Sequence, residues 1–179
     1  GPGNHEIVYT YTEGQCSDFA TQIAVVEALP VIEIVPVGDK CLDDPAFNVI
    51  ATPAGGTFSG TGVSGSTFNP ATGAGTYTIN YSYTAANSCS NTASTSITVS
   101  SIPSVNAGTY SAVCTNSSAI TLSGTPAGGT FSGTGVTGNS FNPAVGAGTY
   151  TINYVYSNGS CSNSASTTIV VNAGPTVNA

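Results

Sequence analysis

The chain has 179 residues and a formal net charge of −7, and only 5% of its residues are charged. Every Asp, Glu, Lys and His lies before Pro45, and the chain has no arginine. Residues 45–179 therefore have no basic side chain to bind the phosphates of nucleic acid and no carboxylate to bind calcium. Their only side chains able to transfer a proton are those of Tyr and Cys. We expect no enzymatic activity, no cofactor and no nucleic-acid partner.

The most apolar run, residues 23–37, comes early in the chain. It is interrupted by Glu27, Pro30, Glu33 and Pro36, so it cannot span a bilayer, and we expect no membrane insertion. We interpret it as two strands joined at Pro30. Pro36 cannot donate to a ladder, which favours an edge position for the second of them.

An internal repeat organises the rest of the chain. The block TPAGGTFSGTGV occurs at residues 52–63 and again, unchanged, at 125–136, a spacing of 73. Residues 1–30 align without a gap on residues 146–175, and residues 73–103 repeat the pattern with one extra residue. The predicted domains are the C-terminal half of a repeat (1–30), two complete repeats (31–103 and 104–175) and the start of another (176–179). We expect the chain to be a section of a longer array.

The strands within a repeat have clear signals. Alternation of Tyr77, Ile79, Tyr81 and Tyr83 with polar residues predicts a strand with one buried face, and a second strand is expected at about 93–99. Shorter strands are expected around the phenylalanines, and the first strands of the two complete repeats at 31–37 and 104–110. Short strands separated by Gly and Pro turns predict an all-β fold of tandem, small antiparallel β-sandwiches.

The five cysteines follow the repeat. Each complete repeat has an early and a late cysteine, and Cys16 is the late cysteine of the half repeat. We predict one disulfide in each complete repeat, Cys41–Cys89 and Cys114–Cys161, with Cys16 unpaired. Such bonds would staple domains too small to bury a large core, and would place the protein in an oxidising compartment. Metal ligation is a weaker alternative, because there is no Cys-x-x-Cys motif.

Two charged groups are candidate sites. Asp39, Asp43 and Asp44 could bind calcium or form a solvated acidic turn, and the next repeat has Ala112, Asn116 and Ser117 instead. His5 and Glu6 form a pair on exposed strand positions without a third partner. Neither group predicts catalysis or a metal site.

The tyrosines allow two interpretations. Their rows could form a core or a platform for stacking carbohydrate. Tyr77 and Tyr150 follow Ala-Gly-Thr at a strand start, where a tyrosine corner would hydrogen-bond back to the chain. The glycines of the TPAGGTFSGTGV block favour turns and bulges over a phosphate cradle, since no lysine accompanies them.

The string TPAGGTFSGTGV, then FNPA, GAGTYTINYxY and Cys-Ser-Asn resembles the Ig-like (PKD-like) tandem repeats of large cell-surface proteins of Bacteroidota. Many of those proteins have a type IX secretion signal and are described as gliding-motility-associated or adhesin-like. The chain departs from antibody domains, because it has no Trp and its late Cys lies 11 or 12 residues after the corner Tyr. The resemblance implies no catalytic residues.

These observations support an extracellular function at a bacterial cell surface. The first hypothesis is a structural and adhesive stalk or filament of stiff repeats, whose partners are neighbouring repeats or like chains. The alternative is that the repeats themselves bind glycans or surfaces as adhesion modules.

Overall fold

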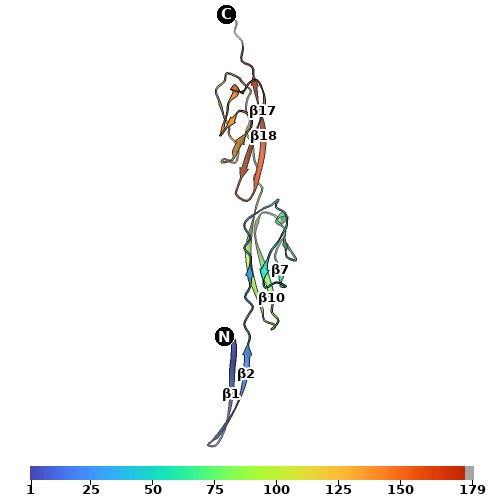
Figure 1. Cartoon of the computed structure of the whole chain (residues 1–179), viewed down its shortest axis with the longest axis vertical. Coiled ribbons are helices and arrows are strands. Elements are labelled where there is room, and N and C mark those ends of the chain that lie inside the picture. The colour runs from blue at the N-terminus through green and yellow to red at the C-terminus, as the bar shows by residue number, and fades with distance from the viewer. Residues whose placement is uncertain (176–179) are drawn as a thin grey trace. The chain divides into compact units, whose positions relative to one another are not determined.

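The computed structural model describes residues 1–175, and its regular secondary structure is almost entirely β-strand (Figure 1). Its only helices in that range are two short 3-10 turns, η1 (Pro70–Thr72) and η2 (Pro143–Val145). The all-β prediction is confirmed. The expected start of a further repeat at 176–179 lies outside the described residues.

The strands of the N-terminal half of the chain are mostly short, with four long exceptions. These exceptions are β1, β2, β10 and β11. The bounds are β1 (Gly3–Glu13), β2 (Cys16–Val26), β3 (Glu33–Ile34), β4 (Lys40–Cys41), β5 (Phe47–Asn48), β6 (Ala51–Thr52), β7 (Thr57–Ser59), β8 (Val63–Ser64), β9 (Thr67–Phe68), β10 (Gly75–Thr84) and β11 (Ser90–Ser100).

The second complete repeat has the same order of elements. Its strands are β12 (Val113–Cys114), β13 (Ile120–Thr121), β14 (Thr130–Ser132), β15 (Val136–Thr137), β16 (Ser140–Phe141), β17 (Gly148–Ser157) and β18 (Ser162–Asn172). One sheet has the order β12-β18-β17-β14, and a smaller one has the order β13-β16-β15. The first repeat has the equivalent sheets, β4-β11-β10-β7 and β5-β9-β8.

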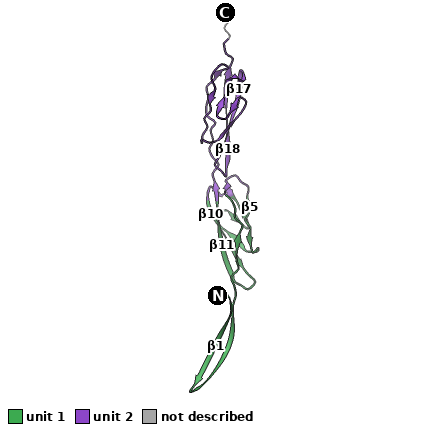
Figure 2. Cartoon of the chain, turned by 60° about the vertical axis from the view of Figure 1, so that its left-hand side comes forward, with its two compact units in different colours: residues 1–38, 46–69, 76–97 green, residues 39–45, 70–75, 98–179 purple. Residues whose placement is uncertain are grey.

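The described residues divide into two compact units (Figure 2). The first contains residues 1–38, 46–69 and 76–97, and the second contains residues 39–45, 70–75 and 98–175. Residues 39–45 of the first complete repeat therefore belong to the same unit as the whole second repeat.

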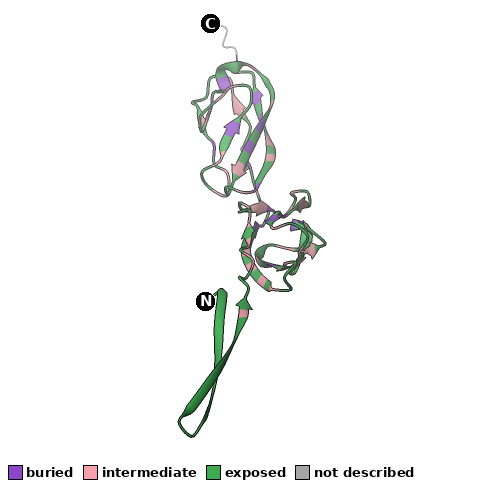
Figure 3. Cartoon of the chain, turned by 60° about the horizontal axis from the view of Figure 1, so that its bottom comes forward, coloured by how far each residue is buried: buried purple, intermediate pink, exposed green. Residues whose placement is uncertain are grey.

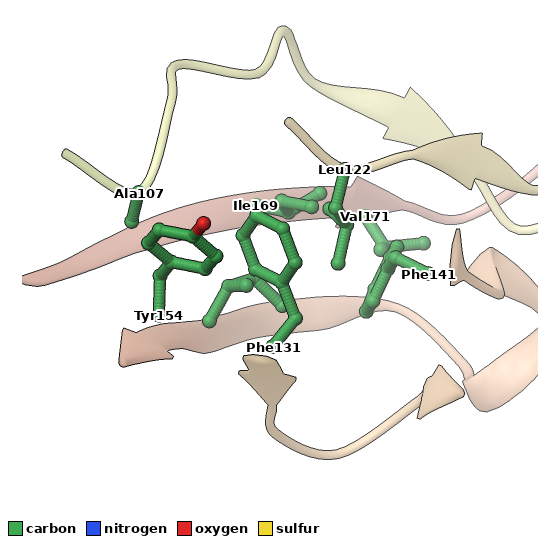
Figure 4. Packing of buried hydrophobic residues seen from close by; sticks show 8 residues of the cluster. Ala107, Leu122, Phe131, Phe141, Tyr154, Ile169 and Val171 are labelled. Carbon is green, nitrogen blue, oxygen red and sulfur yellow. The ribbon is translucent and has the colours of Figure 1, made fainter. Parts of the chain in front are cut away.

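The core of the second repeat is formed by alternate residues of its two sheets, and Figure 4 shows this packing. Ile152 and Tyr154 of β17 and Ile169 of β18 are at most 2% exposed. Phe131 packs on Tyr154 with 4.4 Å between ring centroids. β17, the counterpart in the second repeat of the strand predicted from Tyr77 to Tyr83, is thus the centre of a small β-sandwich.

The N-terminal hairpin β1–β2 lacks such a core. All residues of β1 are exposed, and in β2 only Ala24 is half-buried (Figure 3). Its two strands pair with each other along their whole length, from Gly3 opposite Val26 to Glu13 opposite Cys16.

Two strand predictions need correction. The strand expected at 31–37 is only β3, and the one expected at 104–110 is reduced to a single bridge between Asn106 and Thr125. Pro36 has no N–H to donate, and Gly108 has a φ of +82°, so neither segment continues a ladder. The sandwich is also not wholly antiparallel, because β4 pairs with β11 and β12 pairs with β18 in parallel.

The predicted disulfides Cys41–Cys89 and Cys114–Cys161 are wrong. Within residues 1–175 the structure has one disulfide, Cys41–Cys161, and leaves Cys16, Cys89 and Cys114 free. The statement that each repeat has its own disulfide is therefore wrong as well. The bonded state predicted for Cys41 and Cys161 and the unpaired state predicted for Cys16 agree with the structure, whereas Cys89 and Cys114 were predicted to be bonded and are free.

Strand register explains this correction. Cys114 pairs with Asn172, the last residue of β18, whereas Cys161 precedes its first residue, Ser162. Eleven residue steps at about 3.3 Å put the two cysteines about 36 Å apart. A disulfide needs Cα atoms within about 7 Å. In the first repeat, β11 runs in the same way from Ser90, beside Cys89, to Ser100, which pairs with Cys41.

Candidate functional site

The Cys41–Cys161 disulfide is the feature of the second unit most relevant to function. Its Cα atoms are 4.9 Å apart, although the two residues are separated by 120 positions in sequence. Both cysteines are 1% exposed. The bond joins the early cysteine of one repeat to the late cysteine of the next. Closing so long a loop lowers the entropy of the unfolded chain, which stabilises the fold by about 5 kcal/mol in the chain-entropy treatment.

Cys41 is held by a tight turn. Its N–H donates to Asp44 Oδ2 at 2.9 Å, and the N–H of Asp44 donates to the Cys41 carbonyl at 3.1 Å. Ser117 makes the same pair of bonds with Cys114, at 3.1 Å and 2.9 Å. Asp44 therefore closes a turn that both repeats share, and a serine replaces it in the second.

Two asparagines lie on either side of Cys161 in the sequence, and one of them bonds it directly. Asn158 accepts the N–H of Cys161 at 2.9 Å and donates to the Ser101 carbonyl at 3.1 Å. Asn163 donates to the Pro103 carbonyl at 2.9 Å. The sulfur of Cys161 lies 3.2 Å from the Ser100 carbonyl oxygen. The asparagines thus fix the β17–β18 turn against the segment that follows β11.

The free Cys89 has the same local surroundings in the first unit. Asn87 accepts the N–H of Cys89 at 3.1 Å and donates to the Ala28 carbonyl at 3.5 Å. Asn91 donates to the Pro30 carbonyl at 2.8 Å. These contacts reproduce those around Cys161, even though this repeat has one more residue before its late cysteine.

Three ligand atoms near the disulfide raise the question of a metal site. One oxygen of Asp43 and the sulfurs of Cys41 and Cys161 lie within 4.8 Å of one another. While the disulfide is closed the sulfurs are not thiolates, and thiolate is the form that binds metals. Asp44 is engaged in the turn, where its carboxylate accepts the Cys41 N–H. Asp39 is exposed.

The middle tyrosine of the alternating strand anchors the TPAGGTFSGTGV block. Tyr154 donates its hydroxyl hydrogen to the Pro126 carbonyl, and the oxygen accepts the Gly129 N–H at 2.8 Å. Tyr81 is bonded in the same way to Pro53, at 2.6 Å, and to Gly56, at 2.7 Å. The sequence predicted buried tyrosines but missed this bond, whose only signal is the coincidence of the block with a Tyr at constant spacing.

The tyrosine predicted as a corner makes a hydrogen bond of the kind that defines one. The Tyr150 hydroxyl donates to the Gly146 carbonyl at 3.1 Å. Tyr77 contacts Phe68, with ring centroids 5.6 Å apart. In the N-terminal hairpin His5 takes the corner position, with Nε2 2.8 Å from the Gly1 carbonyl oxygen. His5 therefore has a structural role there.

A hollow lies beside the TPAGGTFSGTGV block of the first unit. It has a volume of about 590 Å³ and is open to solvent. Its lining includes Phe58 and Tyr81 but no acid, base, histidine or cysteine. Tyr81 is the only titratable side chain in this lining, and its hydroxyl is already bonded to Pro53 and Gly56.

No protein-family model matches the chain, and no curated protein matches it. The matching solved structures include extracellular domains 3–5 of Drosophila OTK (10% identity, TM-score 0.38), covering 94% of this chain and 71% of that one. Mouse protocadherin-24 EC1-3 has 12% identity, a TM-score of 0.31 and coverages of 96% and 80%. The insect immune protein hemolin has 14% identity and a TM-score of 0.34, and the match covers 94% of this chain and 56% of that one. Likenesses this distant assign no function.

No helix among the described residues has the length and the apolar character needed to cross a bilayer.

Proposed function

We propose that this chain is a structural section of an extracellular protein, in which disulfides link each repeat to the next so that the array resists tension. The observation that carries the proposal is the Cys41–Cys161 bond between consecutive repeats. A covalent link of this kind lets a stalk or filament carry tension from one repeat to the next, whereas a separate binding module gains nothing from it.

The bond suggests a pairing rule for an array of such repeats, in which an early cysteine bonds the late cysteine of the following repeat. Under this rule Cys114 would bond the late cysteine of a following repeat. Cys89 and Cys16 would each bond the early cysteine of the preceding repeat. All three free cysteines then have a partner of the same kind, and none is left over.

Overlapping disulfides have a mechanical consequence. Each bond would close a loop that overlaps the loop of its neighbour, because the early cysteine of one repeat precedes the late cysteine of the same repeat. A pulling force would pass through covalent bonds at every repeat and could not extend the chain inside them. Noncovalent domains under tension unfold, so this device suits a surface stalk.

Location and composition support the same function. Disulfides persist in oxidising environments, which favours an exported protein. The resemblance to Bacteroidota repeats suggests the bacterial cell surface, type IX secretion and a role in gliding or adhesion. The repeats have no charged side chain after Asp44 to serve in catalysis.

Adhesion by the repeats themselves is less well supported. A carbohydrate platform needs exposed aromatic rings, but Tyr81 and Tyr154 are 2% exposed. In the complete repeats the central tyrosines therefore support the core.

Force spectroscopy on the whole chain, pulled from its two ends, tests the proposal. While the disulfide is closed, force cannot extend the chain segment between Cys41 and Cys161, which are 120 positions apart. Reduction should release it, adding about 400 Å at about 3.4 Å per residue. The variant Cys161→Ser should give the long extension without reductant. Equal extension with and without reductant would refute the proposal.

A further inference from the structure

The N-terminal hairpin β1–β2 is built like the hairpin at the centre of the complete second repeat. Tyr9 pairs with Ala20 as Tyr154 pairs with Ala165, and the registers of the two hairpins agree from end to end. The corner hydrogen bond is also kept, because His5 bonds the Gly1 carbonyl. The hairpin is therefore the late half of a repeat, already in its final register.

The two hairpins differ in how far their inner faces are buried. The inner face is the one that bears Ile152 and Tyr154 in the second repeat, and Ile7 and Tyr9 in the N-terminal hairpin. Ile152 and Tyr154 are 0% and 2% exposed, whereas Ile7 and Tyr9, which occupy the same positions, are 58% and 68% exposed. Val26 also lies on this face and is 47% exposed. An uncovered apolar face of this kind marks a binding surface.

The second repeat shows what covers such a face. Phe131 packs on the Tyr154 ring, and Pro126 and Gly129 bond its hydroxyl. Phe141 of β16 and Leu122 complete the core. All of these residues belong to the early half of the repeat, residues 104–145.

Cys89 provides a second, independent observation. Its asparagine contacts match those that position Cys161 for its bond to Cys41. Cys41 lies opposite Ser100, and Glu27 holds the position of Ser100 in the N-terminal hairpin. An early half seated on the hairpin would therefore bring its own cysteine to Cys89.

We propose that the inner face of β1–β2 binds a polypeptide segment with the pattern of residues 104–145, and that the cysteine of this segment forms a disulfide with Cys89. This deepens the proposed function, because it names the partner that continues the series of linked repeats. Binding would complete a β-sandwich by supplying the missing strands, as in strand complementation.

The covalent step requires an oxidant. The S–H bonds of Cys89 and of the incoming cysteine break and one S–S bond forms. The two electrons and two protons pass to a low-molecular-weight disulfide, which is reduced to two thiols. Oxidised glutathione supplies this reagent in the test.

The test adds a synthetic peptide of residues 104–145 to the whole chain in a glutathione redox buffer. Peptide mapping then measures adducts at Cys16, Cys89 and Cys114, the three free thiols. Docking raises the local thiol concentration, so Cys89 should react at least about tenfold more than the other two. Equal labelling of the three would overturn the proposal. So would a Cys89-linked dimer that forms equally well without peptide.

A matched pair of variants separates docking from simple reactivity. Tyr9→Asp places a charge on the inner face and should abolish the preference for Cys89. Val8→Asp places it on the opposite face and should leave the preference intact. Both side chains are more than half exposed, so neither change disturbs a core. The proposal fails if the two variants behave alike.

A fusion covers the case in which the peptide does not stay soluble. Residues 104–145 placed directly before Gly1 restore the sequence of a complete repeat. Cys89 should then become inert to a thiol reagent, and the amides of β1 and β2 should gain protection from hydrogen exchange. Unchanged reactivity and unchanged exchange would overturn the proposal. The result is independent of the Cys41–Cys161 extension test, which involves neither Cys89 nor the hairpin.

Discussion

The glycine at the end of the Ala-Gly-Gly turn meets the central tyrosine at close range. A Cβ atom built on Gly129 would lie 2.5 Å from Tyr154 Cζ and still closer to the Val155 carbonyl oxygen. Gly56 meets Tyr81 and Ser82 in the same way. This close approach lets the Gly129 N–H reach the tyrosine hydroxyl, which gives a physical reason for the same block in both repeats.

Gly129→Ala should therefore destabilise the second repeat by about 1–3 kcal/mol, because a methyl group has no space there. Urea unfolding of the whole chain would measure the loss. Gly38→Ala is the control, since nothing lies within 4 Å of its Cβ position. Equal stability of the two variants would show that the close approach is not a constraint.

The hydroxyl of Tyr154 can be tested separately. Tyr154→Phe keeps the ring but leaves the Gly129 N–H and the Pro126 carbonyl without this partner, at a cost of about 1–3 kcal/mol. Tyr156→Phe, at a half-buried position of the same strand, should change stability much less. Thermal unfolding compares the two, and a neutral Tyr154→Phe would contradict the assigned role.

At the level of elements, the long strands could be predicted and the short ones only approximately. Alternation in β10 and β17 reports directly on which face is buried, and both strands lie where it placed them. The first strand of each repeat pairs through only one or two residues, so hydrophobicity could not predict where it begins and ends. The partner of β12 is also not encoded locally, because a two-residue parallel pair leaves no periodic signal. That pair decides which end of β18 lies beside Cys114.

Hydrogen exchange should distinguish the two hairpins. The amides of β17 and β18 are in a four-stranded sheet with a packed face, whereas those of β1 and β2 are in a two-stranded sheet whose residues are almost all exposed. A two-stranded hairpin is marginally stable alone. We expect β1–β2 to exchange much faster than β17–β18. Equal protection would mean that its inner face is covered in the isolated chain.

At the level of the whole molecule, the repeat pattern identified early and late cysteines correctly but paired them wrongly. The prediction assumed that each repeat closes on itself. In the structure the long last strand separates the early and late cysteines of one repeat, so the nearest partner for Cys41 comes from the next repeat. The sequence shows how many cysteines each repeat has, but the strand register decides which of them can form a disulfide.

The most direct test of this account is a disulfide map of the whole chain, made by alkylating free thiols and digesting without reduction. The account predicts one linked pair of peptides, containing Cys41 and Cys161, and alkylated Cys16, Cys89 and Cys114. Linked peptides containing Cys41 with Cys89, and Cys114 with Cys161, would show that each repeat closes on itself. That result would contradict the proposal that disulfides join consecutive repeats.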